Sequence, residues 1–183
     1  GIGYVLGEGF DMPPLMFTVD ELEAVMLGLR WVARRGDGQL SRAALDSVAK
    51  IGAVLPEGLK PFLFDAGLVV PPRQDGIIRD AVDVAALRSA IRESRKVAIH
   101  YKDEIDRRTE RTIWPIGIAY YEATRNIIAW CELRQAFRYF RTDRIAAVDI
   151  LKDRYPKRRR ALLKAWQDEM RNESAMPDLD ILV

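Results

Sequence analysis

Arginine recurs at every third position in one aromatic segment of this chain, Phe137-Arg138-Tyr139-Phe140-Arg141-Thr142-Asp143-Arg144-Ile145. Alternate side chains of an extended segment share a face, so Arg138 would lie beside Phe140 and Tyr139 beside Arg141. A guanidinium group binds a phosphate, and an aromatic ring stacks on a base. The pattern therefore predicts binding of a nucleotide or a nucleic acid. The alternative is that these arginines are solvated residues that protect the edge of a sheet.

The distribution of charge favours a binding site for a polyanion. The whole chain of 183 residues has a formal net charge of +2, but residues 88–160 contain 19 Lys and Arg against 10 Asp and Glu. The rest of the chain is therefore acidic. A basic segment within a nearly neutral protein indicates a localised anionic ligand.

Residues for nucleophilic or metal chemistry are scarce. Cys131 is the only cysteine and His100 the only histidine, and both lie in strand-like patterns. We expect Cys131 to be a packing residue and His100 to be a strand residue that could also contact a ligand. With one cysteine and one histidine, the chain alone cannot form a zinc site of the cysteine and histidine type. Asp143 should orient a neighbouring arginine through a charge-assisted hydrogen bond. The sequence predicts a binding protein without a metal or cofactor rather than an enzyme.

The composition is typical of a protein of the cytoplasm. No apolar run is long enough to span a bilayer, and the first residues lack a basic region followed by a hydrophobic signal core. A single cysteine also agrees with a reducing compartment. We therefore expect a cytoplasmic protein.

Helical patterns occupy the first third of the chain. A capping box, Thr18 to Glu21, begins a helix whose apolar residues recur at helical spacing until Gly36. Ser41 is expected to cap a second helix that ends near residues 52–56, and a short third helix should cover residues 58–64. Their apolar faces should pack together, with three large residues in the core or in a dimer interface: Met16, Met26 and Trp31.

The pattern changes after a proline-rich segment at residues 71–76, where we place a domain boundary. Asp83 should cap a helix over residues 84–94, and alternating patterns then predict strands at residues 96–101, 108–113, 116–121, 126–133 and 137–150. The last strand should be broken near Thr142. A basic amphipathic helix should follow Pro156. The expected fold is α+β, in which a helix and five antiparallel strands form a small closed or nearly closed barrel of the Sm or SH3 type.

The strand region resembles the WYL domain of bacterial transcription regulators of the DeoR-like, YafY-like type. Four ordered segments carry the resemblance: Arg95 to Tyr101, Arg111 to Gly117 with its Arg-x-x-x-Pro spacing, Ala129 to Arg134, and Phe137 to Ile145. Residues 1–6 are similar to the end of the wing of a winged-helix domain, and residues 17–56 to the helical connector that follows it. The resemblance implies an Sm-like fold, a sensing role, and DNA-reading helices upstream of Gly1.

The implied organisation has four parts. Residues 1–17 end the wing and its linker, residues 18–75 form the helical connector and dimerisation region, residues 76–152 form the WYL domain, and residues 153–183 form a C-terminal helix and tail. The tripeptide that names the family falls on Arg125-Asn126-Ile127, so its tryptophan and tyrosine are missing here. If that tyrosine holds ligand, another tyrosine has to replace it, and the candidates are Tyr101, Tyr120 and Tyr121.

We therefore expect a transcription regulator whose WYL domain binds single-stranded nucleic acid or a nucleotide and controls an upstream winged helix that binds operator DNA. The expected ligand contacts are Arg111, Arg134, Arg138, Arg141, Arg144 and, as weaker candidates, Tyr101 and His100. We also expect a homodimer, because the apolar helix faces exceed what one small barrel can cover. The alternative is a protein-interaction or dimerisation module whose arginines pair with acidic residues of the helical half. An enzyme acting on nucleotides is a weaker third possibility.

Overall fold

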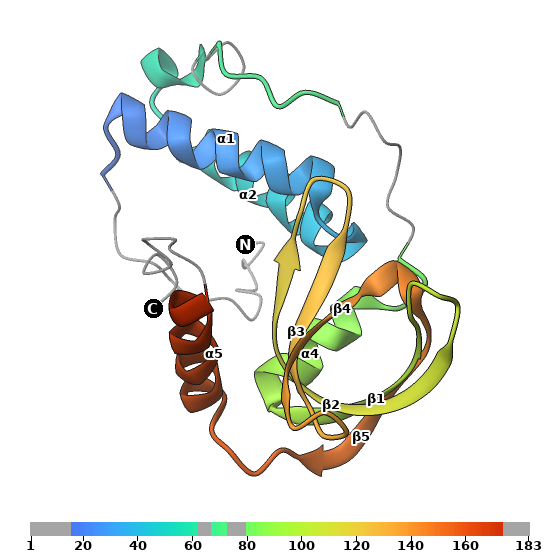
Figure 1. Ribbon diagram of the computed structural model, residues 1–183. Helices are drawn as coiled ribbons and strands as arrows, with labels where there is room; N and C mark the ends of the chain where they lie inside the picture. Colours follow the sequence, from blue (N-terminus) through green and yellow to red (C-terminus); the bar gives the residue numbers. More distant parts are fainter. Residues whose placement is uncertain (1–15, 62–66, 73–79, 174–183) are drawn as a thin grey trace, which may run out of the picture.

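The structure, a computed structural model, describes residues 16–61, 67–72 and 80–173 (Figure 1). Within these residues the fold is α+β, as predicted, with four α-helices and a five-stranded antiparallel sheet. The helices are α1 (Val19–Arg35), α2 (Gly38–Val54), α4 (Val84–Glu93) and α5 (Arg159–Glu173), with short 3-10 helices η1 (Glu57–Leu59) and η2 (Thr142–Arg144). The strands are β1 (Arg95–Lys102), β2 (Arg108–Tyr120), β3 (Arg125–Cys131), β4 (Ala136–Arg141) and β5 (Ile145–Arg154).

The sheet is open, and the prediction of a closed barrel is wrong. The strand order is β4-β3-β2-β1-β5, so β4 and β5 are the two edges of the described sheet. The single turn η2 passes the chain from β4 to the far edge, where β5 pairs with β1 from Ile145↔Tyr101 to Arg154↔Arg95. No β4–β5 pairing occurs among the described strands, so the sheet is not closed. The Sm-like assignment stays a prediction.

Two strand boundaries differ from those that the sequence predicts. The predicted strands at residues 108–113 and 116–121 are one strand, β2, which continues through Pro115 and pairs with β1 at one end and with β3 at the other. The register with β3 shifts between Pro115 and Gly117. Proline has no N–H to donate to a neighbouring strand, and it is tolerated at such an irregularity. The predicted strand at residues 137–150 is divided into β4 and β5 by η2, close to the expected break.

The two N-terminal helices form a tight antiparallel pair. The capping box predicted at Thr18 and Glu21 is present and begins α1. The predicted cap Ser41 is wrong, because α2 begins at Gly38 and its N-cap is Asp37, whose carboxylate accepts the N–H groups of Gln39 and Leu40. The close turn between the helices requires a glycine, since a Cβ at Gly36 would lie 2.7 Å from the carbonyl oxygen of Val32.

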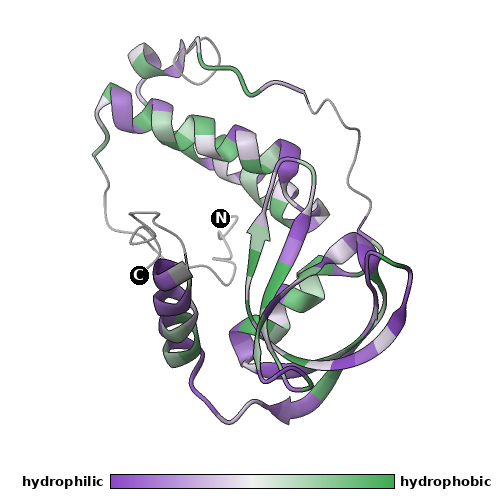
Figure 2. Cartoon of the chain, viewed as in Figure 1, coloured by the Kyte–Doolittle hydropathy of each residue, from purple (hydrophilic) through white to green (hydrophobic). Residues whose placement is uncertain are grey.

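Apolar residues form three clusters. Helix α4 covers one face of the sheet, where Leu87 and Ala90 pack on residues from all five strands, and Cys131 is buried there as a packing residue, as predicted. Helix α5 covers the other face through Leu162 and Trp166. The third cluster lies between α1 and α2. It contains Met26, as expected, whereas Met16 is exposed. Helices α1, α2 and α5 alternate between hydrophobic and hydrophilic residues around their circumference (Figure 2).

The β2–β3 hairpin connects the sheet to the helical pair. Its turn, residues 121–124, extends from the sheet towards α1 and α2 (Figure 1). The predicted wing at residues 1–6, most of the predicted linker at 71–76, and the tail at 174–183 lie outside the described residues. In the part of the chain that the structure describes, no helix is long and apolar enough to cross a lipid bilayer.

Candidate functional site: an arginine turn and a buried polar junction

The turn between β4 and β5 carries two of the predicted ligand residues, and we call residues 141–144 the arginine turn. The guanidinium group of Arg141 binds the carboxylate of Asp143 through two hydrogen bonds, of 3.1 Å from Nε and 2.8 Å from Nη2. Arg144 Nη1 donates to Glu104 Oε1 at 3.1 Å, from the β1–β2 turn. Asp143 thus binds Arg141 at two points, which is the geometry that its predicted role of orienting an arginine requires.

These ion pairs lie at the surface of the protein. The side chains of Arg141 and Asp143 are 37% and 35% exposed, and that of Glu104 is 83% exposed. Hydrogen bonding to Arg141 lowers the pKa of Asp143, and the same contact raises the pKa of Arg141. Exposed pairs contribute at most about 1 kcal/mol. A phosphate, which binds guanidinium groups with the same two-point geometry, could therefore replace either carboxylate.

Two further predicted residues lie near this turn. Tyr101 packs edge-on against Phe140, with ring centroids 5.2 Å apart, and is half-buried on the inner face of β1. Arg111 donates from Nε to Thr109 Oγ1 at 3.2 Å, and Thr109 pairs with Tyr101 across the two strands. Arg111 Nη1 is buried and has no hydrogen-bond partner among the described residues. This donor is unsatisfied, which is unusual for a buried polar group.

The other residues that we expected to contact ligand do not lie at the arginine turn. His100 is exposed and faces away from Tyr101, because adjacent residues of a strand point to opposite faces. Arg134 lies in the exposed turn after β3, at the opposite end of the β3–β4 hairpin from the arginine turn. Arg138 is exposed on the edge strand β4 and donates to the carbonyl oxygen of Phe137 at 2.7 Å. Arg141 and Arg144 therefore form the core of the candidate site, and His100, Arg134 and Arg138 lie apart from it.

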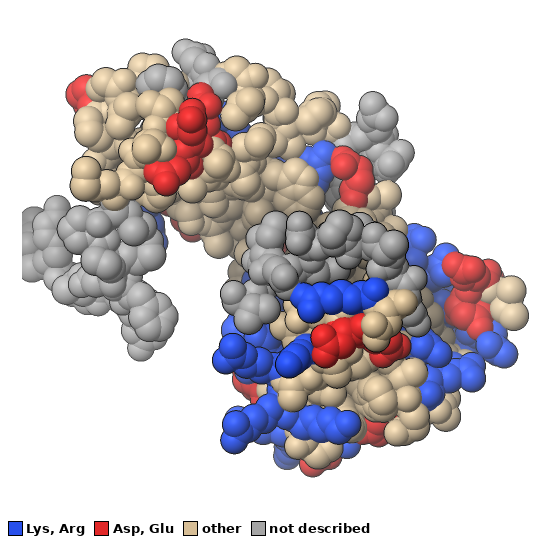
Figure 3. Space-filling model, turned by 60° about the vertical axis from the view of Figure 1, so that its left-hand side comes forward, with Lys and Arg blue, Asp and Glu red and all other residues tan. Residues whose placement is uncertain are grey.

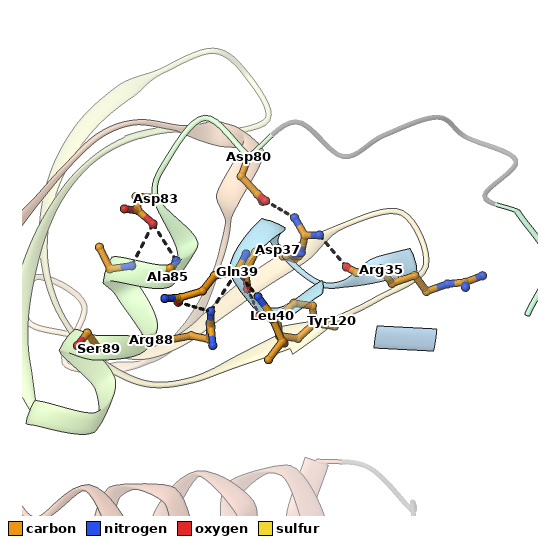
Figure 4. Close-up of polar contacts among 12 residues, drawn as sticks. Arg35, Asp37, Gln39, Leu40, Asp80, Asp83, Ala85, Arg88, Ser89 and Tyr120 are labelled. Atoms are coloured by element: carbon orange, nitrogen blue, oxygen red, sulfur yellow. Dashed lines mark hydrogen bonds and ion pairs between the residues drawn. The ribbon is translucent and has the colours of Figure 1, made fainter. Parts of the chain in front are cut away.

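A second group of polar residues, which the sequence did not reveal, joins the helical pair to the sheet. We call it the junction cluster, and its members are Arg35, Asp37, Asp80, Arg88, Tyr120 and Arg125. Arg125 is only 4% exposed; it forms an ion pair with Asp80 and donates to the carbonyl oxygen of Arg35 at 2.6 Å. Its guanidinium carbon lies 5.5 Å from the ring centroid of Tyr120. The carboxylate of Asp80 and the carbonyl of Arg35 both accept hydrogen bonds from this guanidinium group (Figure 4).

Asp37 is the second centre of the junction cluster. Its carboxylate accepts hydrogen bonds from Arg88 at 3.0 Å and from the hydroxyl of Tyr120 at 3.1 Å, in addition to capping α2 (Figure 4). Burial acts to raise the pKa of Asp37, but the N–H of Leu40, the charge of Arg88 and the Tyr120 hydroxyl together lower it below its ordinary value. Burial and the charge of Asp37 raise the pKa of Tyr120 to about 12.

Thr142 connects the arginine turn to the junction cluster. Its side chain is fully buried, and its hydroxyl lies 2.9 Å from Asp80 Oδ1 and 3.2 Å from the carbonyl oxygen of Arg125. Thr142 is flanked by Arg141 on one side and Asp143 on the other. One short turn thus presents two arginines to solvent and one hydroxyl to the junction.

Arg125, the first residue of the segment expected to correspond to the family tripeptide, is the arginine that binds Asp80 and the carbonyl of Arg35 in α1. Of the tyrosines that could replace the missing one, Tyr120 is bound to Asp37, Tyr121 is 51% exposed, and Tyr101 alone lies beside Phe140 of β4. An arginine at the start of an otherwise apolar strand was the only sequence signal for this cluster.

The lowered pKa of Asp37 predicts that the junction weakens in acid. A carboxylate whose pKa is lower in the folded than in the unfolded protein stabilises the fold above the unfolded pKa of about 3.9, and this contribution is lost as pH falls through the folded pKa. We expect the Asp37→Asn variant to lose less stability than the wild type between pH 5 and pH 2. Urea unfolding at each pH measures this difference. Parallel stability curves for the two proteins would contradict the prediction.

The described residues contain no group of three or more His, Cys, Asp or Glu side chains that could hold a metal ion. Half of the residues of both sites are arginines, whose guanidinium groups bind anions. Among the arginines predicted to bind ligand, Arg141 pairs with Asp143 and Arg144 pairs with Glu104. Neither of these carboxylates belongs to α1 or α2. Pairing between the two halves is made by other arginines, as in the pair of Arg88 with Asp37.

Comparison with known proteins agrees with the family that the strand motifs resemble. The family model of the WYL domain matches residues 83–150. Among solved structures, the chain is similar to proteasome accessory factor B/C (PafBC) of Arthrobacter aurescens, with 23% sequence identity and a TM-score of 0.40 over 79% of this chain. The match covers 22% of the PafBC chain, so the present chain spans about a fifth of that protein. Residues 83–150, which comprise α4 and most of the sheet with its arginine turn, are a WYL domain.

Proposed function

We propose that this chain is the sensing part of a transcription regulator of the DeoR-like, YafY-like type. Its WYL domain binds a negatively charged effector, single-stranded nucleic acid or a nucleotide, at the arginine turn. The effector then controls a winged helix that precedes this chain and binds operator DNA. The protein acts by binding, not by catalysis, and works in the cytoplasm.

The observation that supports this proposal most is the two-sided arginine turn. Arg141 and Arg144 are held by exposed carboxylates that a phosphate can replace, while Thr142 between them contacts the junction cluster. Tyr101 offers an aromatic ring beside the turn on which a base could stack in part.

The same turn provides a physical route to the helical pair. If a phosphate draws Arg141 away from Asp143, the turn rearranges and the contact of Thr142 with Asp80 changes. Asp80 binds Arg125, and Arg125 binds the last turn of α1 through the carbonyl of Arg35. Ligand binding controls α1 only if the ligand binds one arrangement of these contacts more tightly than another.

The proposal includes a homodimer formed through the helical pair. An apolar groove of about 440 Å³ lies between α1, α2 and residues 67–70, and it is lined by Met26, Leu29 and Leu45 among others. Leu45 is 57% and Val54 is 83% exposed on α2. A second copy of the chain would cover such exposed apolar residues, and a twofold dimer suits a palindromic operator.

Two substitutions in the arginine turn should change effector binding in opposite directions. Arg141→Ala removes a phosphate contact, so single-stranded oligonucleotide should bind more weakly and with a salt dependence shallower by roughly 0.7. Asp143→Asn removes the carboxylate that competes for Arg141, so the oligonucleotide should bind more tightly. The measurement is fluorescence anisotropy of a labelled oligonucleotide across a salt titration.

Arg92→Ala is the matched control, because Arg92 is an exposed arginine on α4 and belongs to neither site. Thermal melting checks that each variant folds. If all three variants bind as the wild type does, or if Arg141→Ala unfolds, the arginines belong to the fold. The alternative of a protein-interaction module would then be the better interpretation.

A further inference from the structure

Helix α5 carries a straight stripe of positive charge. Arg160, Lys164 and Arg171 follow one another at spacings of four and seven residues, which at 3.6 residues per turn places them within an arc of about 40°. All three are exposed. Arg171 has the carboxylate of Asp168 at 3.9 Å, whereas Arg160 and Lys164 form no ion pair with any described residue. A stripe that served only solubility would be expected to mix both signs.

The opposite face of α5 fixes this stripe in space. Leu162 and Trp166 are buried against the sheet, and the Trp166 indole donates to the hydroxyl of Tyr139 at 2.9 Å. At the beginning of the helix Arg159 Nη1 donates to the carbonyl oxygen of Ile116 at 3.1 Å. The helix therefore cannot turn its cations inward without losing these contacts.

The first turn of α5 breaks a rule of helix stability. Cations are unfavourable at a helix N-terminus because the helix dipole is positive there, yet Lys157, Arg158, Arg159 and Arg160 are consecutive and the first turn has no acidic residue. Arg159 and Lys157 have partners within the fold, in the carbonyl of Ile116 and the ring of Trp130. Arg158 and Arg160 form no ion pair with any described residue. A local rule that is broken in this way often marks a functional position. An anion bound beside this turn would be stabilised by the dipole and by the arginines together.

A groove follows the stripe. Its volume is about 520 Å³, and it is lined by Arg158, Arg160, Ala161, Leu163, Lys164, Gln167, Asp168 and Arg171. Four cations thus face one carboxylate. Gln167 also lines the groove, and its amide nitrogen is buried and has no hydrogen-bond partner among the described residues. Lys and Arg side chains crowd the lower part of the molecule in Figure 3, whereas few are visible on α1 and α2.

We propose that this face of α5 binds the phosphate backbone of duplex nucleic acid, independently of base sequence. From Arg160 to Arg171 the helix rises about 16 Å, and over that length of axis one strand of a duplex has about five phosphates, one per 3.4 Å. Any duplex therefore offers a partner to each cation, whereas an acidic protein segment would need carboxylates in one matching line. The surface lies on a different element from the arginine turn, and the proposal does not depend on an effector.

The test compares a double variant, Arg160→Ala/Lys164→Ala, with the wild-type chain in binding a duplex of arbitrary sequence over a salt titration. Both residues are exposed, so the fold should persist, and circular dichroism checks it. Loss of two phosphate contacts should make the slope of log affinity against log salt shallower by about 1.8. The double variant Arg42→Ala/Lys50→Ala is the control, since it removes two exposed cations from α2 and so has the same net charge as the α5 double variant.

Equal slopes for the two double variants would overturn the proposal, because the effect would then be one of net charge alone. If α5 substitution weakened binding of poly-glutamate but not of duplex, the face would belong to an acidic protein partner and the proposal would fail. Arg141→Ala should leave duplex binding unchanged. This variant separates failure at α5 from failure of the effector site.

Discussion

Replacing Arg125 by methionine should destabilise the protein by about 3–5 kcal/mol, as expected when one partner of a buried ion pair is removed. Methionine fills a similar volume, but it leaves the Asp80 carboxylate, whose side chain is 13% exposed, with the Thr142 hydroxyl as its one side-chain partner among the described residues. It also removes the donor to the carbonyl of Arg35. Urea unfolding of the variant and the wild type measures the change in free energy.

A second substitution tests whether the uncompensated charge causes this loss. In Arg125→Met/Asp80→Asn the neutral amide can still accept the Thr142 hydroxyl, so more than half of the lost stability should return. Arg138→Met is the control, because Arg138 is exposed on the edge strand and its loss should change stability by less than about 0.5 kcal/mol. Additive destabilisation by the two junction substitutions would contradict this explanation.

Trp166→Ala should release α5 from the sheet and cost about 3–5 kcal/mol, the usual cost of removing a buried tryptophan side chain. Trp166 is 7% exposed, lies in the cluster with Ile116 and Tyr155, and donates to the Tyr139 hydroxyl. Since the α4 side of the sheet forms a separate cluster, the loss should be local. Hydrogen exchange should show faster exchange of α5 amides while β1 amides stay protected.

Trp166→Phe separates the two contributions of this side chain. The phenyl ring keeps most of the apolar contact but cannot donate to Tyr139, so this variant should lose about 1 kcal/mol. Uniformly faster exchange in α5 and β1 of Trp166→Ala would instead mean that α5 and the sheet unfold as one unit.

Periodicity in the sequence determined much of the WYL domain. The cap at Asp83 and the helical pattern after it predicted α4, and alternation predicted the positions of β1, β3 and β4. The break near Thr142 and the pairing of Asp143 with an arginine were also predictable. These features depend on residues a few positions apart, whose geometry the local backbone decides.

Only the tertiary structure decided which polar residues meet at the junction. Arg125 binds Asp80 and Arg35, which lie 45 and 90 residues away, and Tyr120 binds Asp37 across 83 residues. No local pattern specifies such partners. The sequence also grouped Arg134 with Arg141 as ligand contacts, and the β3–β4 pairing places these two residues at opposite ends of the hairpin.

The sheet shows the same division between local and long-range causes. Local patterns determined which residues form strands, but Trp114 and Pro115 suggested an end where β2 in fact continues, because pairing with β3 and a shift of register outweigh the missing N–H. The strand order that leaves the sheet open was likewise decided by where β5 finds a partner. Local periodicity reflects the preferences of one segment, whereas strand pairing and buried ion pairs depend on segments that meet only in the folded chain.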